Sequence, residues 1–152
     1  MQKIACLALL GLLVGCAPDL PEGWQDAESV DDFTQDECDD TGGTDPDEVE
    51  TTVTATADDP GLRVVGEGVF FRCSQDVEGF FRTRGDAVDV LVQPVDMNPR
   101  SVAKCDCSYR IEAGIPEEPP ATVNLYRRSD HHGQDEGEPN DPTLVGSAEV
   151  AR

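Results

Sequence analysis

The sequence predicts an all-β protein: an antiparallel β-sandwich of about seven strands, stapled by disulfides and preceded by a disordered acidic tether. Three observations lead to this prediction. Apolar and polar residues alternate over several short segments separated by turn residues, and no segment repeats with a helical period. Four cysteines follow residue 16, and an even number is typical of disulfides in an exported protein. Residues 17–50 hold fourteen acidic residues and no basic one.

The chain begins with a leader that is typical of secretion. Lys3 precedes an apolar run from Ile4 to Gly15. As a helix this run would rise about 18 Å, well short of the roughly 30 Å hydrocarbon core of a bilayer. Residues 1–15 are therefore predicted to be a cleaved signal peptide rather than a membrane span.

The end of this leader, Leu13-Val14-Gly15-Cys16, resembles the lipobox of bacterial lipoproteins. In that family the cysteine is lipidated and becomes the first mature residue. The resemblance implies that the protein is exported and held to a membrane through a lipid on Cys16. Because alanine rather than aspartate follows the cysteine, it further implies the outer membrane, with the periplasmic or surface face left open.

The acidic segment 16–46 is predicted to be a disordered tether. It is poor in apolar residues and scattered with Pro and Gly, so it cannot bury enough surface to offset its chain entropy. Its charge argues against nucleic-acid binding and against electrostatic adhesion to a membrane, since both need a basic surface. A calcium site is a further hypothesis, although the spacing does not match an EF-hand loop. Its candidate ligands are Asp36, Asp39, Asp40, Asp45 and Asp47.

The predicted β domain covers residues 47–152. Alternation places strands at 49–57, 62–73, 77–84, 87–93, 105–113, 122–127 and 143–150. Gly66 and Gly68 indicate a bulge or kink in the second of these strands. Gly85-Asp86 indicates a tight hairpin turn between the third and the fourth.

Cys38, Cys73, Cys105 and Cys107 are predicted to form two disulfides. Zinc is the competing use, but structural zinc sites usually gather two close ligand pairs, and here only one pair is close. Cys105 and Cys107 share one strand face, so each is expected to bond outside its own strand. Two arrangements with Cys38 and Cys73 follow. The deeper position of Cys107 favours Cys73–Cys107 with Cys38–Cys105.

Three strand motifs resemble a group of uncharacterised bacterial lipoproteins. The motifs are Gly68-Val69-Phe70-Phe71-Arg72-Cys73, Cys105-Asp106-Cys107-Ser108-Tyr109-Arg110-Ile111 and Thr122-Val123-Asn124-Leu125-Tyr126. In that group a cysteine closes an early strand, and a C-x-C-x-Y strand and a T-V-x-[LV]-Y strand follow. The resemblance covers residues 61–127 and implies an Ig-like sandwich with disulfides. It implies no activity, because the motifs are structural.

Candidates for chemistry are few. His131 and His132 are the only histidines, and with Asp130, Asp135 or Glu136 they are the candidate ligands of an adventitious zinc or copper site. Adjacent side chains in an extended loop point apart, which disfavours joint chelation. Ser129-Asp130-His131 is contiguous, and such neighbours rarely converge on one reacting atom. No catalytic residue, resident metal or cofactor is therefore predicted.

The sequence thus predicts a lipid-anchored, non-enzymatic protein of the cell envelope. Its β-sandwich would serve a structural purpose or bind an unknown envelope or surface protein, with no nucleic acid as a partner. The alternative is a ligand-binding or metal-binding module that uses the loops 94–104 and 129–142.

Overall fold

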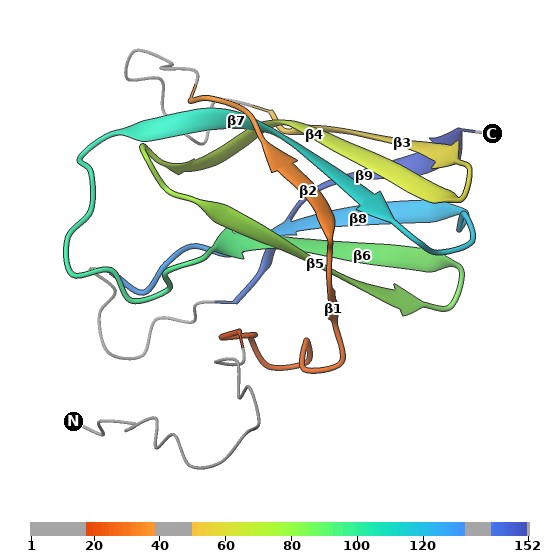
Figure 1. Ribbon diagram of the computed structural model, residues 1–152, viewed down its shortest axis with the longest axis horizontal. Helices are drawn as coiled ribbons and strands as arrows, with labels where there is room; N and C mark the ends of the chain where they lie inside the picture. Colours follow the sequence, from red (N-terminus) through yellow and green to blue (C-terminus); the bar gives the residue numbers. More distant parts are fainter. Residues whose placement is uncertain (1–17, 39–49, 133–140, 152) are drawn as a thin grey trace, which may run out of the picture.

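The computed structural model describes residues 18–38, 50–132 and 141–151, which form one curled β-sheet (Figure 1). Its strands are β1 (Glu28–Ser29), β2 (Asp32–Gln35), β3 (Thr52–Asp58), β4 (Gly61–Arg72), β5 (Val77–Arg84), β6 (Ala87–Pro94), β7 (Asp106–Ile115), β8 (Thr122–Arg127) and β9 (Thr143–Ala151). They pair in the order β1-β5-β6-β8-β9-β3-β4-β7-β2, with β6–β8 and β3–β9 parallel and the other pairs antiparallel. The predicted all-β fold is confirmed, in the form of one continuous sheet. Within the described ranges, no helix has the length and apolar character that crossing a bilayer requires.

The strands predicted from alternation are all present as β3 to β9. The glycines in β4 mark an irregularity, because the register of β4 against β7 shifts between Gly66 and Val69. Gly68 has a φ of 75° there, a left-handed conformation that favours glycine. Gly85 adopts a φ of 61° in the turn between β5 and β6, as the predicted hairpin requires.

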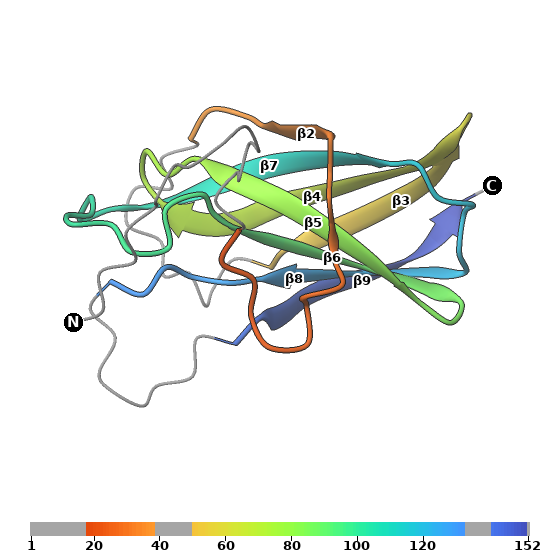
Figure 2. The ribbon, with the colours of Figure 1, turned by 60° about the horizontal axis from the view of Figure 1, so that its bottom comes forward.

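The core lies between the two halves of the curled sheet. Figures 1 and 2 show β4 and β7 on one side of the molecule and β6 and β8 on the other. In β6 the side chains of Val88, Val90 and Val92 are buried in this core, and in β7 every second residue from Cys107 to Ile115 joins them. The period-two alternation of these strands therefore correctly predicted the inward face.

The described residues before β3 belong to the fold, contrary to the prediction of a disordered tether over 16–46. β1 pairs with β5 and β2 pairs with β7, so the chain crosses between the two edges of the sheet within a few residues (Figure 1). Val30, between them, is buried and its backbone N–H donates to the Gly79 carbonyl at 2.9 Å. This crossing links the two edges of the sheet. The tether prediction is wrong for residues 18–38, and residues 39–46 lie outside the described ranges.

The same N-terminal segment covers the outer face of β5, β6 and β8. Trp24 is only 3% exposed and packs with Phe80 and Leu91. Its ring meets Tyr126 edge-on at 5.4 Å between centroids, and the Arg82 guanidinium carbon lies 3.7 Å from the Trp24 ring centroid. Because this outer face is covered, β6 is buried on both sides.

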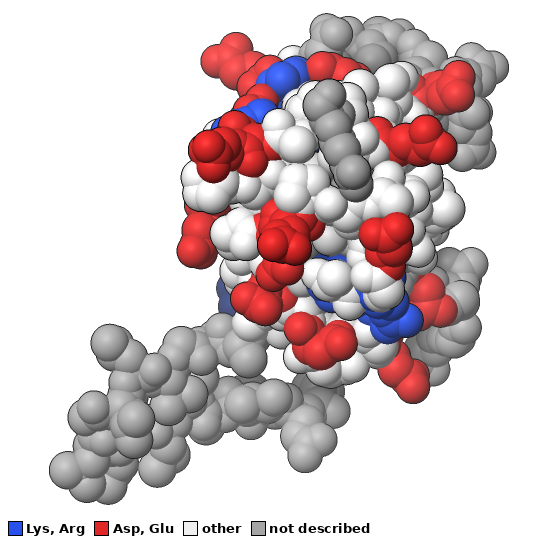
Figure 3. Space-filling model, turned by 90° about the vertical axis from the view of Figure 1, so that its right-hand side faces the viewer, with Lys and Arg blue, Asp and Glu red and all other residues white. Residues whose placement is uncertain are grey.

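The two ends of the sheet carry different features. One end, here called the cysteine end, holds the four cysteines, the turn 73–76 and the loops 94–104 and 129–132. The other end holds the turns that join β3 to β4 and β5 to β6. Figure 3 views the molecule toward that second end, where acidic side chains are spread over the visible surface and far outnumber basic ones.

Candidate functional site

The cysteine end is held by two disulfides, Cys38–Cys107 and Cys73–Cys105. As predicted, Cys105 and Cys107 each bond to a cysteine outside their own strand. The favoured pairing, Cys73–Cys107 with Cys38–Cys105, is wrong. Cys73 lies opposite Cys105 because its N–H donates to the Cys105 carbonyl at 3.0 Å, next to the last pair of the β4–β7 ladder. Cys38 follows β2, which runs beside β7 and carries Cys38 to Cys107. Since β2 lies in a segment predicted to be disordered, no strand from residues 16–46 was expected beside Cys107.

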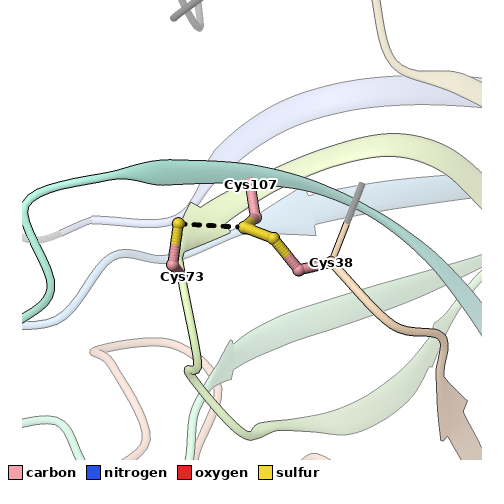
Figure 4. Close-up of side chains that lie close together, drawn as sticks. All are labelled: Cys38, Cys73 and Cys107. Atoms are coloured by element: carbon pink, nitrogen blue, oxygen red, sulfur yellow. Dashed lines mark hydrogen bonds between the residues drawn. A yellow bond between two sulfur atoms is a disulfide. The ribbon is translucent and has the colours of Figure 1, made fainter. Parts of the chain in front are cut away.

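Sulfur atoms of the two disulfides are in contact (Figure 4). Cys107 Sγ lies 3.0 Å from Cys73 Sγ, and the Sγ atoms of Cys38, Cys73 and Cys107 all lie within 4.8 Å of one another. As disulfide sulfurs they carry no hydrogen, so this is a sulfur–sulfur contact. Among the described residues, no other group of His, Cys, Asp or Glu ligand atoms is this close together. Zinc binds thiolates, so the disulfide-bonded form is not a zinc site.

A cavity of about 510 Å³ opens beside Cys73, between the turn 73–76 and the loop 94–103. Its lining residues are Cys73, Ser74, Gln75, Asp76, Pro94, Val95, Asp96, Pro99, Ser101, Val102 and Ala103. The volume falls within the roughly 300–1,000 Å³ of small-molecule sites. The lining includes two carboxylates and no basic side chain. It therefore suits a neutral or cationic ligand better than an anionic one.

The two loops singled out by the sequence meet at this end. The His131 N–H donates to the Met97 carbonyl at 2.8 Å, and His132 Nδ1 lies 3.2 Å from the Pro99 carbonyl oxygen. These contacts tie residues 131 and 132 to the loop 94–104. Residues 133–140 of the second loop lie outside the described ranges.

The candidate metal ligands do not converge on one point. His131 Nε2 faces the Asp19 carboxylate at 3.3 Å, whereas His132 faces the loop 94–104. Asp130 is buried and accepts hydrogen bonds from Gln75 Nε2 at 2.6 Å and from the His132 N–H at 2.9 Å. It also pairs with Arg72 Nε at 3.3 Å. Asp130 thus organises the loop, and Asp135 and Glu136 lie outside the described ranges.

Two buried polar side chains border the site. Arg128 is 5% exposed and donates to the backbone carbonyl of Asp19 and to Gln93 Oε1. Burial lowers the pKa of Arg128, while the nearby Asp19 carboxylate acts in the opposite direction. Burial raises the pKa of Tyr109, whose hydroxyl donates to the Arg72 carbonyl at 3.2 Å. Both side chains therefore fasten neighbouring segments to the sheet.

A separate charged network lies on the outer face of β2, β3, β4 and β7. Glu112 accepts a hydrogen bond from Arg63 and pairs with Arg110 at 2.9 Å. Arg63 also contacts Asp58 at 3.1 Å and Asp32 at 3.7 Å. Hydrogen bonds from Arg63, and then from Arg110, lower the pKa of Glu112. The network joins these strands across their solvent face and takes no part in the cysteine end.

Other sequence candidates lie mostly outside the described residues. Of the calcium candidates, only Asp36 is described, and its backbone N–H donates to the Arg110 carbonyl at 3.0 Å. The remaining four, Asp39, Asp40, Asp45 and Asp47, are outside the described ranges, as is the lipidation candidate Cys16. The calcium and lipidation predictions therefore stay predictions.

No protein-family model, curated protein or solved structure matches this chain. The strand motifs that resemble the lipoprotein group lie on β4, β7 and β8, next to the disulfides. Their resemblance remains an expectation from the sequence.

Proposed function

We propose that this protein is an exported, lipid-anchored and non-enzymatic component of the bacterial cell envelope. Its β-sheet body serves a structural purpose or binds an envelope partner. The lipobox supports the anchor, and the two disulfides favour an oxidising compartment. The observation that carries the proposal is the short distance along the chain between Cys16 and the first residues of the folded body. Among the described residues Asp19 already contacts the sheet, and it lies only three residues further along the chain.

This spacing sets how close the body sits to the membrane. Three extended residues span at most about 10 Å. Asp19 accepts a hydrogen bond from Gln93 and faces Arg128 and His131, all at the cysteine end. A lipid on Cys16 would hold that end against the membrane, with the loop 94–104 beside the bilayer and the hairpin turns pointing away. The folded body would therefore lie close to the membrane rather than at the end of a long tether. We call this its seated position.

A lipid suits this protein better than electrostatic adhesion does. The formal net charge is −21, and an anionic membrane surface attracts basic segments and repels acidic ones. Acyl chains anchor through apolar burial, at about 0.8 kcal/mol per methylene, and more than one chain gives stable attachment. The acidic surface is then left free for an envelope partner, whether in the outer membrane or beneath it.

Mass spectrometry of the mature protein tests the anchor. The wild-type protein is expected in the membrane fraction, with an N-terminal peptide that starts at Cys16 and carries the mass of the lipid. The Cys16→Ser variant is expected to leave the membrane fraction. An unmodified amine on any other N-terminal residue would refute lipidation.

Energy transfer from Trp24, the only tryptophan, tests the seated position. The lipidated protein in vesicles with fluorescent headgroups is expected to transfer energy efficiently. A matched control carries a flexible Gly/Ser insertion between residues 17 and 18, which lengthens the connection without touching the body. Equal transfer in both proteins would show that the body is not held close to the membrane.

A second candidate function is ligand or metal binding at the cysteine end. The observation that favours it is the cavity between the turn 73–76 and the loop 94–103, beside the meeting point of the two predicted loops. Isothermal titration of the mature Cys16→Ser protein with calcium and with zinc separates the two candidates. Stoichiometric submicromolar binding would favour this second function. Crosslinking in intact cells followed by capture of the protein identifies a partner under the first.

A further inference from the structure

We propose that the four cysteines form an exchangeable disulfide pair. When an external dithiol reduces Cys38–Cys107, the freed Cys107 thiolate attacks Cys73 and expels Cys105. The product has a Cys73–Cys107 disulfide and two exposed thiols, on Cys38 and Cys105. This inference does not depend on the lipid anchor, so the two stand or fall separately.

The contact between the disulfides defines the attack. Thiol–disulfide exchange needs a thiolate in direct reach of a disulfide sulfur. Cys107 Sγ lies 3.0 Å from Cys73 Sγ, a distance that leaves no room for an atom between them (Figure 4). The attacked sulfur is therefore that of Cys73, and the leaving group is Cys105.

Exposure allows the reaction to start at Cys38. Cys38 is exposed at the end of the described segment 18–38, whereas Cys107 is fully buried in the core. An external thiolate can reach Cys38 and displace Cys107 as the leaving thiolate. The incoming dithiol then forms a mixed disulfide with Cys38, and its second thiolate releases Cys38 as a thiol.

Burial also decides the direction of the second step. A thiolate on Cys107 would be surrounded by core side chains, where a charge is poorly solvated. Attack on Cys73 transfers that charge to Cys105, which is exposed. The Cys105 thiolate then takes a proton from solvent. Moving the charge from the core to the surface favours exchange over a resting Cys107 thiolate.

The overall reaction balances. Two protein disulfides and one dithiol give one protein disulfide, two protein thiols and one oxidised dithiol, with two electrons passing from the dithiol to the protein. The final Cys73–Cys107 bond joins β4 and β7 diagonally, since Cys107 faces Phe71 in the ladder and Cys73 faces Cys105. Cys38 is no longer bonded to β7, although the backbone pairs of β2 with β7 remain. The exposed thiols are then available to bond covalently with a thiol-bearing partner.

Disulfide mapping after limited reduction tests this proposal. The mature Cys16→Ser protein is treated with an equimolar amount of dithiothreitol, alkylated in acid-quenched denaturant and digested. Trypsin cannot separate Cys105 from Cys107, because no basic residue lies between them, but a protease that cleaves before aspartate cuts at Asp106. The expected products are alkylated Cys38 and Cys105, with a Cys73–Cys107 crosslinked peptide. Alkylated Cys38 and Cys107 with an intact Cys73–Cys105 peptide would overturn the proposal, as would loss of Cys73–Cys105 alone.

The double variant Cys73→Ser/Cys105→Ser is the matched control. It removes the acceptor disulfide and keeps Cys38–Cys107, so exchange is impossible. Reduction of this variant is expected to leave alkylated Cys38 and Cys107 only. Low acrylamide quenching of Trp24 shows that the variant is folded. If the variant does not fold, the Cys73–Cys107 peptide from the wild-type protein still decides whether the disulfides exchange.

Discussion

Replacing Trp24 by alanine tests whether the N-terminal segment is a structural part of the sheet. Trp24 is 3% exposed, packs on Phe80 and Leu91, and lies against the guanidinium of Arg82, whose side chain is 10% exposed. Truncating a buried tryptophan costs about 3–5 kcal/mol. We expect Trp24→Ala to lower the free energy of unfolding by about 4 kcal/mol. For a domain of this size, that corresponds to a drop in melting temperature of roughly 15 °C.

The assay is urea unfolding followed by far-ultraviolet circular dichroism, because the variant has lost its only tryptophan. Trp24→Phe is the matched control: it keeps an aromatic face for Arg82 and is expected to cost less than about 2 kcal/mol. Exposed positions usually change stability by no more than about 0.5 kcal/mol. A change that small for Trp24→Ala would mean that residues 18–27 do not dock on the sheet, and the seated position proposed for the membrane anchor would lose its basis.

Three further substitutions test other parts of the structure. Asp130→Asn removes a buried carboxylate that accepts from Gln75 and pairs with Arg72, so thermal unfolding should show a loss of about 2 kcal/mol, whereas Asp36→Asn on the surface should change little. Gly79→Ala would bring a Cβ within 2.6 Å of the Phe33 ring, and we expect a loss of about 1–3 kcal/mol by urea unfolding, relieved when Phe33→Leu is added. The hydrogen bond from Arg63 lowers the pKa of Glu112 in the folded protein. The ionised Glu112 therefore contributes its full stabilisation above the ordinary glutamate pKa of about 4.3, and this stabilisation is lost as pH falls through the lower pKa of the folded state. Melting curves across this pH range should therefore show a shallower acid loss in Glu112→Gln, and parallel curves would contradict the assigned pairing.

The strands of the main body were predictable because each has one face in the core. In β7 the alternation from Cys107 to Ile115 matches burial residue by residue. The glycines in β4 marked the register shift because a left-handed backbone at Gly68 favours a residue without a side chain. Local pattern and local geometry coincide in these strands, so the sequence alone was enough.

The N-terminal strands were not predictable from composition. Their segment is acidic and poor in apolar residues, yet a few side chains provide the contacts: Trp24 covers the outer face, and Val30 enters the core. The sequences of β5 and β6 do indicate that a covering segment is needed. Phe80 and Leu91 are apolar, and so are neighbouring residues that face the opposite side of the sheet. A strand that is apolar on both faces needs cover on both. Since the predicted elements supplied cover on one side only, the acidic segment was the remaining candidate.

The packing of residues 18–38 also explains why disulfide exchange need not change the position of the body at the membrane. Trp24 and Asp19 hold the start of the segment against β5, β6 and β8, whereas Cys38 holds its end against β7. Exchange at the cysteines releases only that end, because the Trp24 contacts and the β2–β7 backbone pairs involve no sulfur. Energy transfer from Trp24 to membrane lipids should therefore be the same before and after limited reduction. A change in transfer on reduction would mean that the disulfide at Cys38, and not the packing of Trp24, holds the body in its position at the membrane.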